Sequence, residues 1–161
     1  MGGVSFFKLL RYLVLGDPLT WFRICQYRDW LFPIKNLIYK ICSKRRMIDL
    51  PVETKVGYGL YIGHGMCIVV NKHTIIGNNV NLSQFVNIGA NRQIGAVICD
   101  NVYVAPMTCL VENVQIGFNS IIGAGSVVVK NVPSRSTYAG VPAKKISDNF
   151  VENIMNEYKI L

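Results

Sequence analysis

A single histidine, His64, interrupts the apolar run YIGHGMCIVV at residues 61–70. Imidazole accepts a proton near neutral pH and could act as a general base, although an isolated histidine more often has a hydrogen-bonded structural role. Cys67, three residues later, could be a nucleophile paired with His64, but a cysteine in an apolar run is more often simply buried. We assign the other histidine, His73, to a solvated loop, with contact to a substrate as the alternative.

The elements around these residues follow a six-residue repeat of branched aliphatic side chains. Six residues are three strand periods, so one residue per repeat returns to the same inward environment. Intervening glycines and asparagines suit corners with positive φ. The pattern predicts a parallel β-helix of about four coils, each made of three short strands. The repeating positions are Val56, Ile62, Ile68, Ile76, Leu82, Ile88, Ile98, Val104, Leu110, Ile116, Ile122 and Val128.

The repeat changes phase twice. The step from Ile68 to Ile76 is eight residues, and the step from Ile88 to Ile98 is ten. Extra residues in a solenoid leave it as loops on one face, often the binding face. Both loops are therefore candidate parts of a site, and the first is expected just after His64.

The segments that flank the repeat have a different pattern. We expect a helical cap over residues 1–46, with helices at 5–14, 18–31 and 34–43, because apolar residues recur there at helical spacing. Asp17 and Pro18 are typical of a helix start. The alternative is an interfacial membrane anchor, because large aromatic residues accompany basic residues in 5–46. Residues 133–145 are expected to form a loop, followed by a helix at 147–159 capped by Ser147 or Asp148.

Composition narrows the class of protein. No stretch of 18 apolar residues and no signal-peptide pattern is present in the 161 residues, so we expect a cytoplasmic protein without a spanning helix. The five cysteines include no Cys-x-x-Cys pair, which disfavours a disulfide framework or a metal site. The net charge of +8 favours anionic partners. The basic residues are concentrated in 35–46 and 130–145, and the middle of the chain is nearly uncharged. This distribution argues against nucleic-acid binding.

Several segments between residues 49 and 146 resemble hexapeptide-repeat acyltransferases of the serine acetyltransferase type. They are KVGYGLYIGHG, IVV, NLSQFVNIG, IIGAGSVVVKNVP and YAGVPAKKI. This branch includes polysaccharide O-acetyltransferases. The resemblance implies a mainly β protein with a left-handed β-helix over 47–132, and a CoA-site loop and C-terminal helix over 133–161. It also implies a homotrimer with active sites between subunits and direct transfer of acetyl from acetyl-CoA to a hydroxyl.

The resemblance also assigns residues. It makes His64 the general base and Asp49, fifteen residues earlier, the carboxylate that orients it. Gln84, Arg92 and His73 are acceptor-side candidates. The alternative for the small residues expected at the CoA site is tight β-helix corners, and for its lysines a solvated surface. The candidates for binding CoA are Gly89, Ala105, Ala124, Gly125, Ser126, Lys130, Gly140, Ala143 and Lys144.

Departures from the family pattern concern the acceptor. The second loop, ANRQIGA at 90–96, is short and has no histidine, and Met107 replaces a small residue. Only about 46 residues precede the coils, so a lone trimer is expected. We therefore favour a sugar hydroxyl in surface polysaccharide biosynthesis, with serine O-acetylation in cysteine biosynthesis as the alternative. A third possibility, a non-catalytic trimeric scaffold, fits Asp49 and His64 less well.

Overall fold

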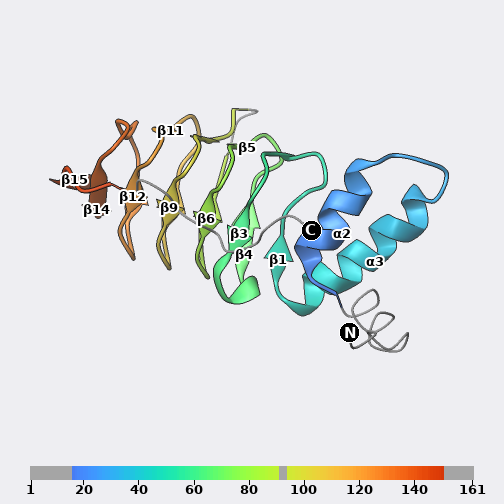
Figure 1. The fold of residues 1–161 in the computed structure, drawn as a ribbon. Coiled ribbons are helices and arrows are strands. Elements are labelled where there is room, and N and C mark those ends of the chain that lie inside the picture. The colour runs from blue at the N-terminus through green and yellow to red at the C-terminus, as the bar shows by residue number, and fades with distance from the viewer. Residues whose placement is uncertain (1–15, 91–93, 151–161) are drawn as a thin grey trace, which may run out of the picture. The chain divides into compact units, whose positions relative to one another are not determined.

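The computed structural model describes residues 16–90 and 94–150 (Figure 1). The chain divides into two compact units, Met1–Ile48 and Asp49–Leu161. The first unit is helical and the second is a β-helix. Each unit is described by itself.

Two helices, α2 (Pro18–Gln26) and α3 (Phe32–Arg45), make up the described part of the first unit. Asp17 is the N-cap residue of α2 and Pro18 opens the helix, as predicted. The expected helix at 18–31 ends at Gln26, and Pro33 lies inside the first turn of α3 rather than between two helices. Proline fits there because N–H groups in the first turn of a helix have no intrahelical acceptor, so the N–H that proline lacks costs no hydrogen bond. The helix expected at 5–14 lies outside the described residues.

The two helices pack through aromatic and thiol side chains. The Phe22 ring of α2 lies 6.0 Å from the Tyr39 ring of α3, between centroids. Cys25 and Cys42 are buried with them. Neither described helix has the length and hydropathy needed to cross a membrane.

The described residues from Ile48 onward form fifteen short strands in three sheets. The first sheet has the order β1-β4-β7-β10-β13, the second β11-β8-β5-β2, and the third β15-β14-β12-β9-β6-β3. The strands are β1 (Ile48–Asp49), β2 (Lys55–Val56), β3 (Tyr61–Ile62), β4 (Ile68–Val70), β5 (Ile75–Ile76), β6 (Asn81–Leu82), β7 (Asn87–Ile88), β8 (Val97–Ile98), β9 (Tyr103–Val104), β10 (Cys109–Leu110), β11 (Gln115–Ile116), β12 (Ile121–Ile122), β13 (Val127–Val128), β14 (Thr137–Gly140) and β15 (Ala143–Ser147).

Successive strands pass from the second sheet to the third and then to the first, which makes four complete coils from β2 to β13 (Figure 1). The pairs between coils are parallel, so the predicted parallel β-helix is confirmed. Its core is a set of aliphatic columns, one for each sheet. The buried column members are Val70, Ile88, Leu110 and Val128; Ile76, Ile98, Ile116 and Val132; and Ile62, Leu82, Val104 and Ile122.

The first change of phase was placed wrongly from the sequence. Val70, not Ile68, pairs with Ile88 in the first sheet. The eight-residue step therefore runs from Ile62 to Val70 and contains His64 itself. Residues 68 and 70 both face inward because the strand period is two, so both are buried and the pattern alone did not separate them.

The second change of phase is confirmed by the register. Asn87 pairs with Cys109, 22 residues later, whereas Val69 pairs with Asn87 after only 18. The four extra residues lie between β7 and β8. Residues 91–93 of this loop lie outside the described part of the chain.

The turns from the third sheet to the first form one edge of the β-helix, which we call the 3–1 corner (residues 63–67, 83–86, 105–108 and 123–126). Cys67, Phe85, Met107 and Gly125 follow one another along it with φ between 55° and 66°. This left-handed conformation costs little for glycine but about 1–2 kcal/mol for a residue with a Cβ. Phe85 and Met107 are nevertheless exposed there.

The turns from the first sheet to the second form the 1–2 corner (residues 71–74, 89–96, 111–114 and 129–131). The remaining corner, from the second sheet to the third, uses asparagine as predicted, with Asn79, Asn101 and Asn119 at positive φ. Asn78 beside them has another role, because its Oδ1 accepts a hydrogen bond from the Tyr58 N–H at 2.9 Å.

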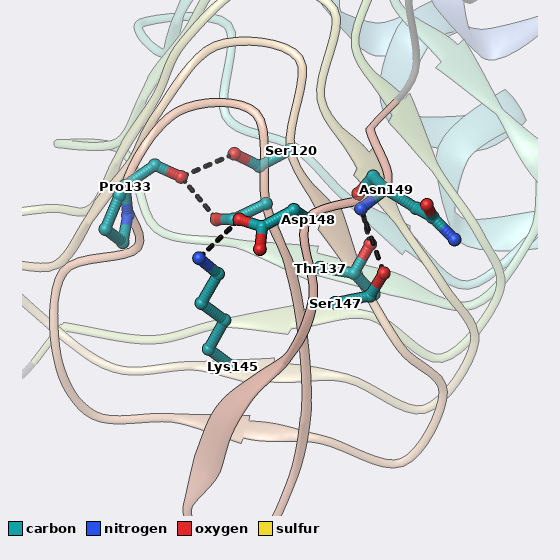
Figure 2. Close-up of polar contacts among 8 residues, drawn as sticks. Ser120, Pro133, Thr137, Lys145, Ser147, Asp148 and Asn149 are labelled. Carbon is teal, nitrogen blue, oxygen red and sulfur yellow. Dashed lines mark hydrogen bonds and ion pairs between the residues drawn. The ribbon is translucent and has the colours of Figure 1, made fainter.

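The segment after the coils is a β-hairpin rather than the expected loop over 133–145. β14 lies parallel to β12, and β15 returns antiparallel to β14 through a cis Val141–Pro142 peptide. Ser147 ends β15, and its Oγ accepts a hydrogen bond from the Asn149 N–H at 2.9 Å (Figure 2). Residues 148–150, which follow it, are not helical. Most of the helix expected at 147–159 lies outside the described residues.

Candidate active site

His64 lies in a short turn, Gly63–Gly65, at the start of the 3–1 corner. Its backbone has φ 59° and ψ −1°, and its side chain is exposed. The two extra residues of the first coil carry the chain out of the solenoid here, since Ile62 before the turn and Ile68 after it are both buried. This explains how an imidazole fits in an apolar run: the residues on either side of the turn are in the core, and His64 is not.

Asp49 is the exposed second residue of β1, which neighbours β4 in the first sheet. Within residues 16–90 and 94–150, no hydrogen bond or ion pair joins its carboxylate to His64. The orienting contact implied by the family resemblance therefore stays a prediction for this chain.

A strip of small residues runs along the third sheet beside the 3–1 corner. Its members directly follow the inward-facing residues of successive strands: Gly63, Ser83, Ala105, Gly123 and Ala139. The coils are close here, because a Cβ on Gly123 would lie 2.8 Å from that of Ala139. Only Ser83 has a side chain beyond Cβ, so no bulky side chain projects from the strip. Gly63, Ser83 and Ala105 are buried in the single chain, and Gly123 and Ala139 are half-buried.

The structure brings six of the predicted site residues to this one edge. His64, Gln84, Ala105, Ala124, Gly125 and Ser126 all belong to the 3–1 corner, on successive coils. Ala124 and Gly125 are exposed, and no atom lies within 4 Å of a Cβ built on Gly125. The edge therefore has open space beside its last coil.

Ser126 differs from its neighbours because its side chain is buried. Its hydroxyl donates a hydrogen bond to the Gly123 carbonyl at 2.6 Å and accepts one from the Gly140 N–H at 3.1 Å. The second bond joins the last coil to the hairpin. This arrangement favours a positioning role for Ser126 over the direct contact with a ligand that we expected.

Other candidates lie elsewhere on the β-helix. Gly89, His73 and Lys130 belong to the 1–2 corner, so the structure separates them from His64 within one chain. His73 is in a regular corner and not in the inserted segment. Its backbone N–H donates to Asn71 Oδ1 at 2.9 Å. Arg92 lies outside the described residues.

The hairpin carries the remaining candidates. Gly140 ends β14 at φ 101°, and Ala143 and Lys144 begin β15. Lys145 forms an ion pair with Asp148, which raises the pKa of the lysine by holding its charged form (Figure 2). Lys144 and Lys130 are exposed and have no acidic partner among the described residues. They leave positive charge available to an anionic ligand.

Sequence reasoning missed Phe85, which lies at the 3–1 corner between Cys67 and Met107. Its N–H donates to the Cys67 carbonyl at 2.6 Å, and its side chain is exposed beside the small-residue strip. A bulky residue at positive φ was the available signal, but it is visible only once the corner is assigned.

Together, these features define the chain as a hexapeptide-type parallel β-helix protein with a basic hairpin at the end of its coils. No family model matches the chain. The mitochondrial serine acetyltransferase 3 of Arabidopsis thaliana is 37% identical over 112 residues, which cover 67% of this chain and 29% of that protein.

Two solved structures have the same fold. A serine acetyltransferase in complex with CoA superposes with a TM-score of 0.70 at 25% identity, covering 80% of this chain and 55% of that one. The Neisseria gonorrhoeae serine acetyltransferase in complex with serine gives 0.71 at 29% identity, covering 81% and 55%. The chain belongs to the hexapeptide-repeat acyltransferase family of the serine acetyltransferase type, and its β-helix is the left-handed form of that family. It spans about half the length of these structures.

Proposed function

We propose that the protein is an acetyl-CoA-dependent O-acetyltransferase whose acceptor is the hydroxyl of serine. The observation that carries the proposal is the position of His64. It is an exposed imidazole on an inserted turn, and a strip of small residues continues from it along the coils. The relatives named above support both substrates, since they are serine acetyltransferases and two of the solved structures hold CoA or serine.

In the proposed reaction, the neutral imidazole of His64 takes the proton of the serine hydroxyl as its oxygen attacks the thioester carbonyl. The carbon–sulfur bond then breaks, and the imidazolium returns the proton to the leaving CoA thiolate. The products are O-acetylserine and CoA. General-base help of this kind contributes about 10²–10⁴-fold. The Asp49 carboxylate would stabilise the imidazolium, and backbone N–H groups would hold the developing oxyanion.

The small-residue strip would take the CoA arm, because no bulky side chain projects from it. The N–H groups of Ser83, Ala105 and Gly123 already bond the next coil, so the contact would be mainly one of shape. Gly140, Ala143 and Lys144 of the hairpin lie at its far end, where Lys144 would meet the phosphates. Lys130 and Gly89 belong to the 1–2 corner, and would contribute only where two subunits meet.

We propose a homotrimer for that reason and because apolar side chains are exposed on the coils. Val69, Phe85 and Met107 are each at least 45% exposed in one chain. A second subunit would cover them. Five free cysteines fit a reducing cytoplasm, where we place the reaction.

The acceptor differs from our expectation from the sequence. The short second loop favoured a sugar hydroxyl in surface polysaccharide biosynthesis, whereas the relatives found are serine acetyltransferases and give that role no support. A sugar acceptor is therefore an outcome of the test.

The test is thiol release from acetyl-CoA with L-serine, comparing the wild type with His64→Ala. We expect serine-dependent release that falls by about 10²–10⁴-fold in the variant, with CoA affinity by calorimetry unchanged. Lys55→Ala, at an exposed position of β2 in the second sheet, is the control and should retain activity. CoA binding without serine-dependent thiol release would overturn the proposed acceptor, and thiol release with a nucleotide sugar would then support the sugar hypothesis. Equal losses of activity in the His64 and Lys55 variants would overturn the role of His64.

A further inference from the structure

Helix α3 is apolar on two opposite sides. Tyr39 and Cys42 are buried within the helical unit. Ile34, Leu37 and Ile41 are 58%, 59% and 51% exposed. Their spacing of three and four residues places them on one stripe of the helix. We call this stripe, with its flanking side chains Lys40, Lys44 and Arg45, the α3 outer face. An apolar stripe that is exposed opposite the packed side of a helix is available to another apolar surface.

The charge of the α3 outer face is positive. Lys40, Lys44 and Arg45 are exposed along it, and none has an acidic partner among the described residues. The only acidic residue between positions 18 and 48 is Asp29, whose Oδ2 accepts a hydrogen bond from Lys35 Nζ at 2.7 Å. The face therefore combines apolar side chains with uncompensated cations.

Two large aromatic residues precede the helix. Trp30 is 86% exposed and Tyr27 is 78% exposed. Indole and phenol rings combine an apolar body with a polar tip, and both are enriched where hydrocarbon meets water. Their exposure just before an apolar and basic helix is the pattern of an interfacial segment.

We infer that the α3 outer face binds the surface of an anionic lipid bilayer, with the helix lying in the plane of the membrane. Fourteen residues make a helix of about 21 Å, which is shorter than the ~30 Å hydrocarbon core, so α3 does not span it. The apolar stripe would enter the boundary between headgroups and acyl chains, and the three cations would meet the lipid charges.

The charge of the α3 outer face favours an anionic lipid surface over two other occupants, residues 1–15 and a second copy of the chain. Residues 1–15 include Lys8 and Arg11 and no acidic residue, so that segment does not complement a cationic face. A second copy of the chain would bring the same three cations against the first. Of the three, only the anionic lipid surface complements both the apolar stripe and its charge.

The experiment is co-sedimentation of the full chain with vesicles of phosphatidylcholine alone or with phosphatidylserine. We expect binding to the anionic vesicles at physiological salt and at least tenfold weaker binding to the neutral ones. Lys40→Gln/Lys44→Gln should weaken binding by about 30-fold, from about 1 kcal/mol for each cation at an anionic surface. The matched control Lys55→Gln/Lys72→Gln changes net charge equally on exposed residues of the β-helix.

A second variant tests the apolar part. Ile34→Ser/Leu37→Ser/Ile41→Ser should lose most binding while its circular dichroism and melting stay those of the wild type. Vesicles should also shift the tryptophan emission to shorter wavelength in the wild type and not in Trp30→Phe.

Several results would overturn the inference. They are no wild-type binding, equal binding to neutral vesicles, equal losses in both lysine pairs, or full binding by the triple serine variant. A lower mass of that serine variant in sedimentation equilibrium would show that a second copy covers the face instead. Loss of binding only on deletion of residues 1–15, with α3 variants unaffected, would assign it to that segment.

Discussion

Replacing Ser126 by alanine tests whether one buried hydroxyl holds the terminal hairpin on the last coil. The hydroxyl donates to Gly123 O at 2.6 Å and accepts from Gly140 N at 3.1 Å. Ser136 offers a matched control, because its buried hydroxyl donates to Pro133 O at 2.6 Å and makes no bond to the hairpin turn. The Pro133 carbonyl keeps a second hydroxyl donor, Ser120 at 2.9 Å (Figure 2). The Thr108 hydroxyl lies 3.3 Å from the Gly123 carbonyl, but its single proton is shared with the nearer Ala105 carbonyl at 2.8 Å.

The magnitude follows from the number of bonds lost. A hydrogen bond contributes about 0.5–1.5 kcal/mol net, so Ser126→Ala should lower the free energy of unfolding by about 1–3 kcal/mol and Ser136→Ala by about half as much. For a chain of this size, each kcal/mol corresponds to about 2–4 °C in Tm. The hairpin carries Lys144, so only Ser126→Ala should also raise the KM for acetyl-CoA severalfold, with kcat retained.

Thermal unfolding at fixed protein concentration and steady-state kinetics measure both effects. Equal losses of stability in the two variants would refute the second bond of Ser126. An equal KM for acetyl-CoA in the two variants would refute the link between hairpin position and CoA binding.

Two further predictions concern glycines and thiols. Gly117→Ala should be severely destabilising, by more than about 3 kcal/mol, because its Cβ would lie 2.4 Å from the Ser134 nitrogen and such overpacking cannot relax. Gly125→Ala should cost only about 1–2 kcal/mol, from its φ of 66° in open space, and similar unfolding midpoints in urea would contradict this difference. Burial raises the pKa of the Cys25 thiol, so an aromatic disulfide reagent at pH 8 should modify exposed Cys109 rapidly and Cys25 only on unfolding; equal rates would contradict the burial.

The β-helix could be predicted from the sequence because its signal is repeated on every coil. Leu82, Val104 and Ile122 are one coil of 18 residues apart, with four inserted residues between the first two, and all three are buried. The site followed from an exception to the same pattern, since a histidine between two glycines marks where the chain leaves the core.

The register of the first coil could not be predicted. Ile68 and Val70 are both apolar and both buried, and only the pairing of Val70 with Ile88 decides between them. The two possibilities differ by the placement of two inserted residues. Sequence periodicity counts residues between columns but does not say at which corner an insertion leaves the solenoid.

The terminal hairpin and the role of Ser126 depend on contacts distant in sequence. Gly140 and Pro142 are typical of a loop, but residues on either side of them pair as strands. Ser126 in a GAGS segment could equally face a ligand or the interior. Its burial and its bond to Gly140 follow from stacking of the hairpin on the last coil, which no local pattern encodes.

The reversal of direction at β15 affects how the third sheet can grow. A stack of parallel coils presents an unpaired strand at its end, which is a template for another molecule. Here the edge strand runs antiparallel to its neighbour β14 and carries Lys144 and Lys145, both exposed. A coil of a second molecule would meet the wrong strand direction and the cation of Lys144, which is unpaired among the described residues, whereas Lys145 is paired with Asp148. The same hairpin that would hold the phosphates of CoA thus protects this edge against fibre-like end-to-end assembly.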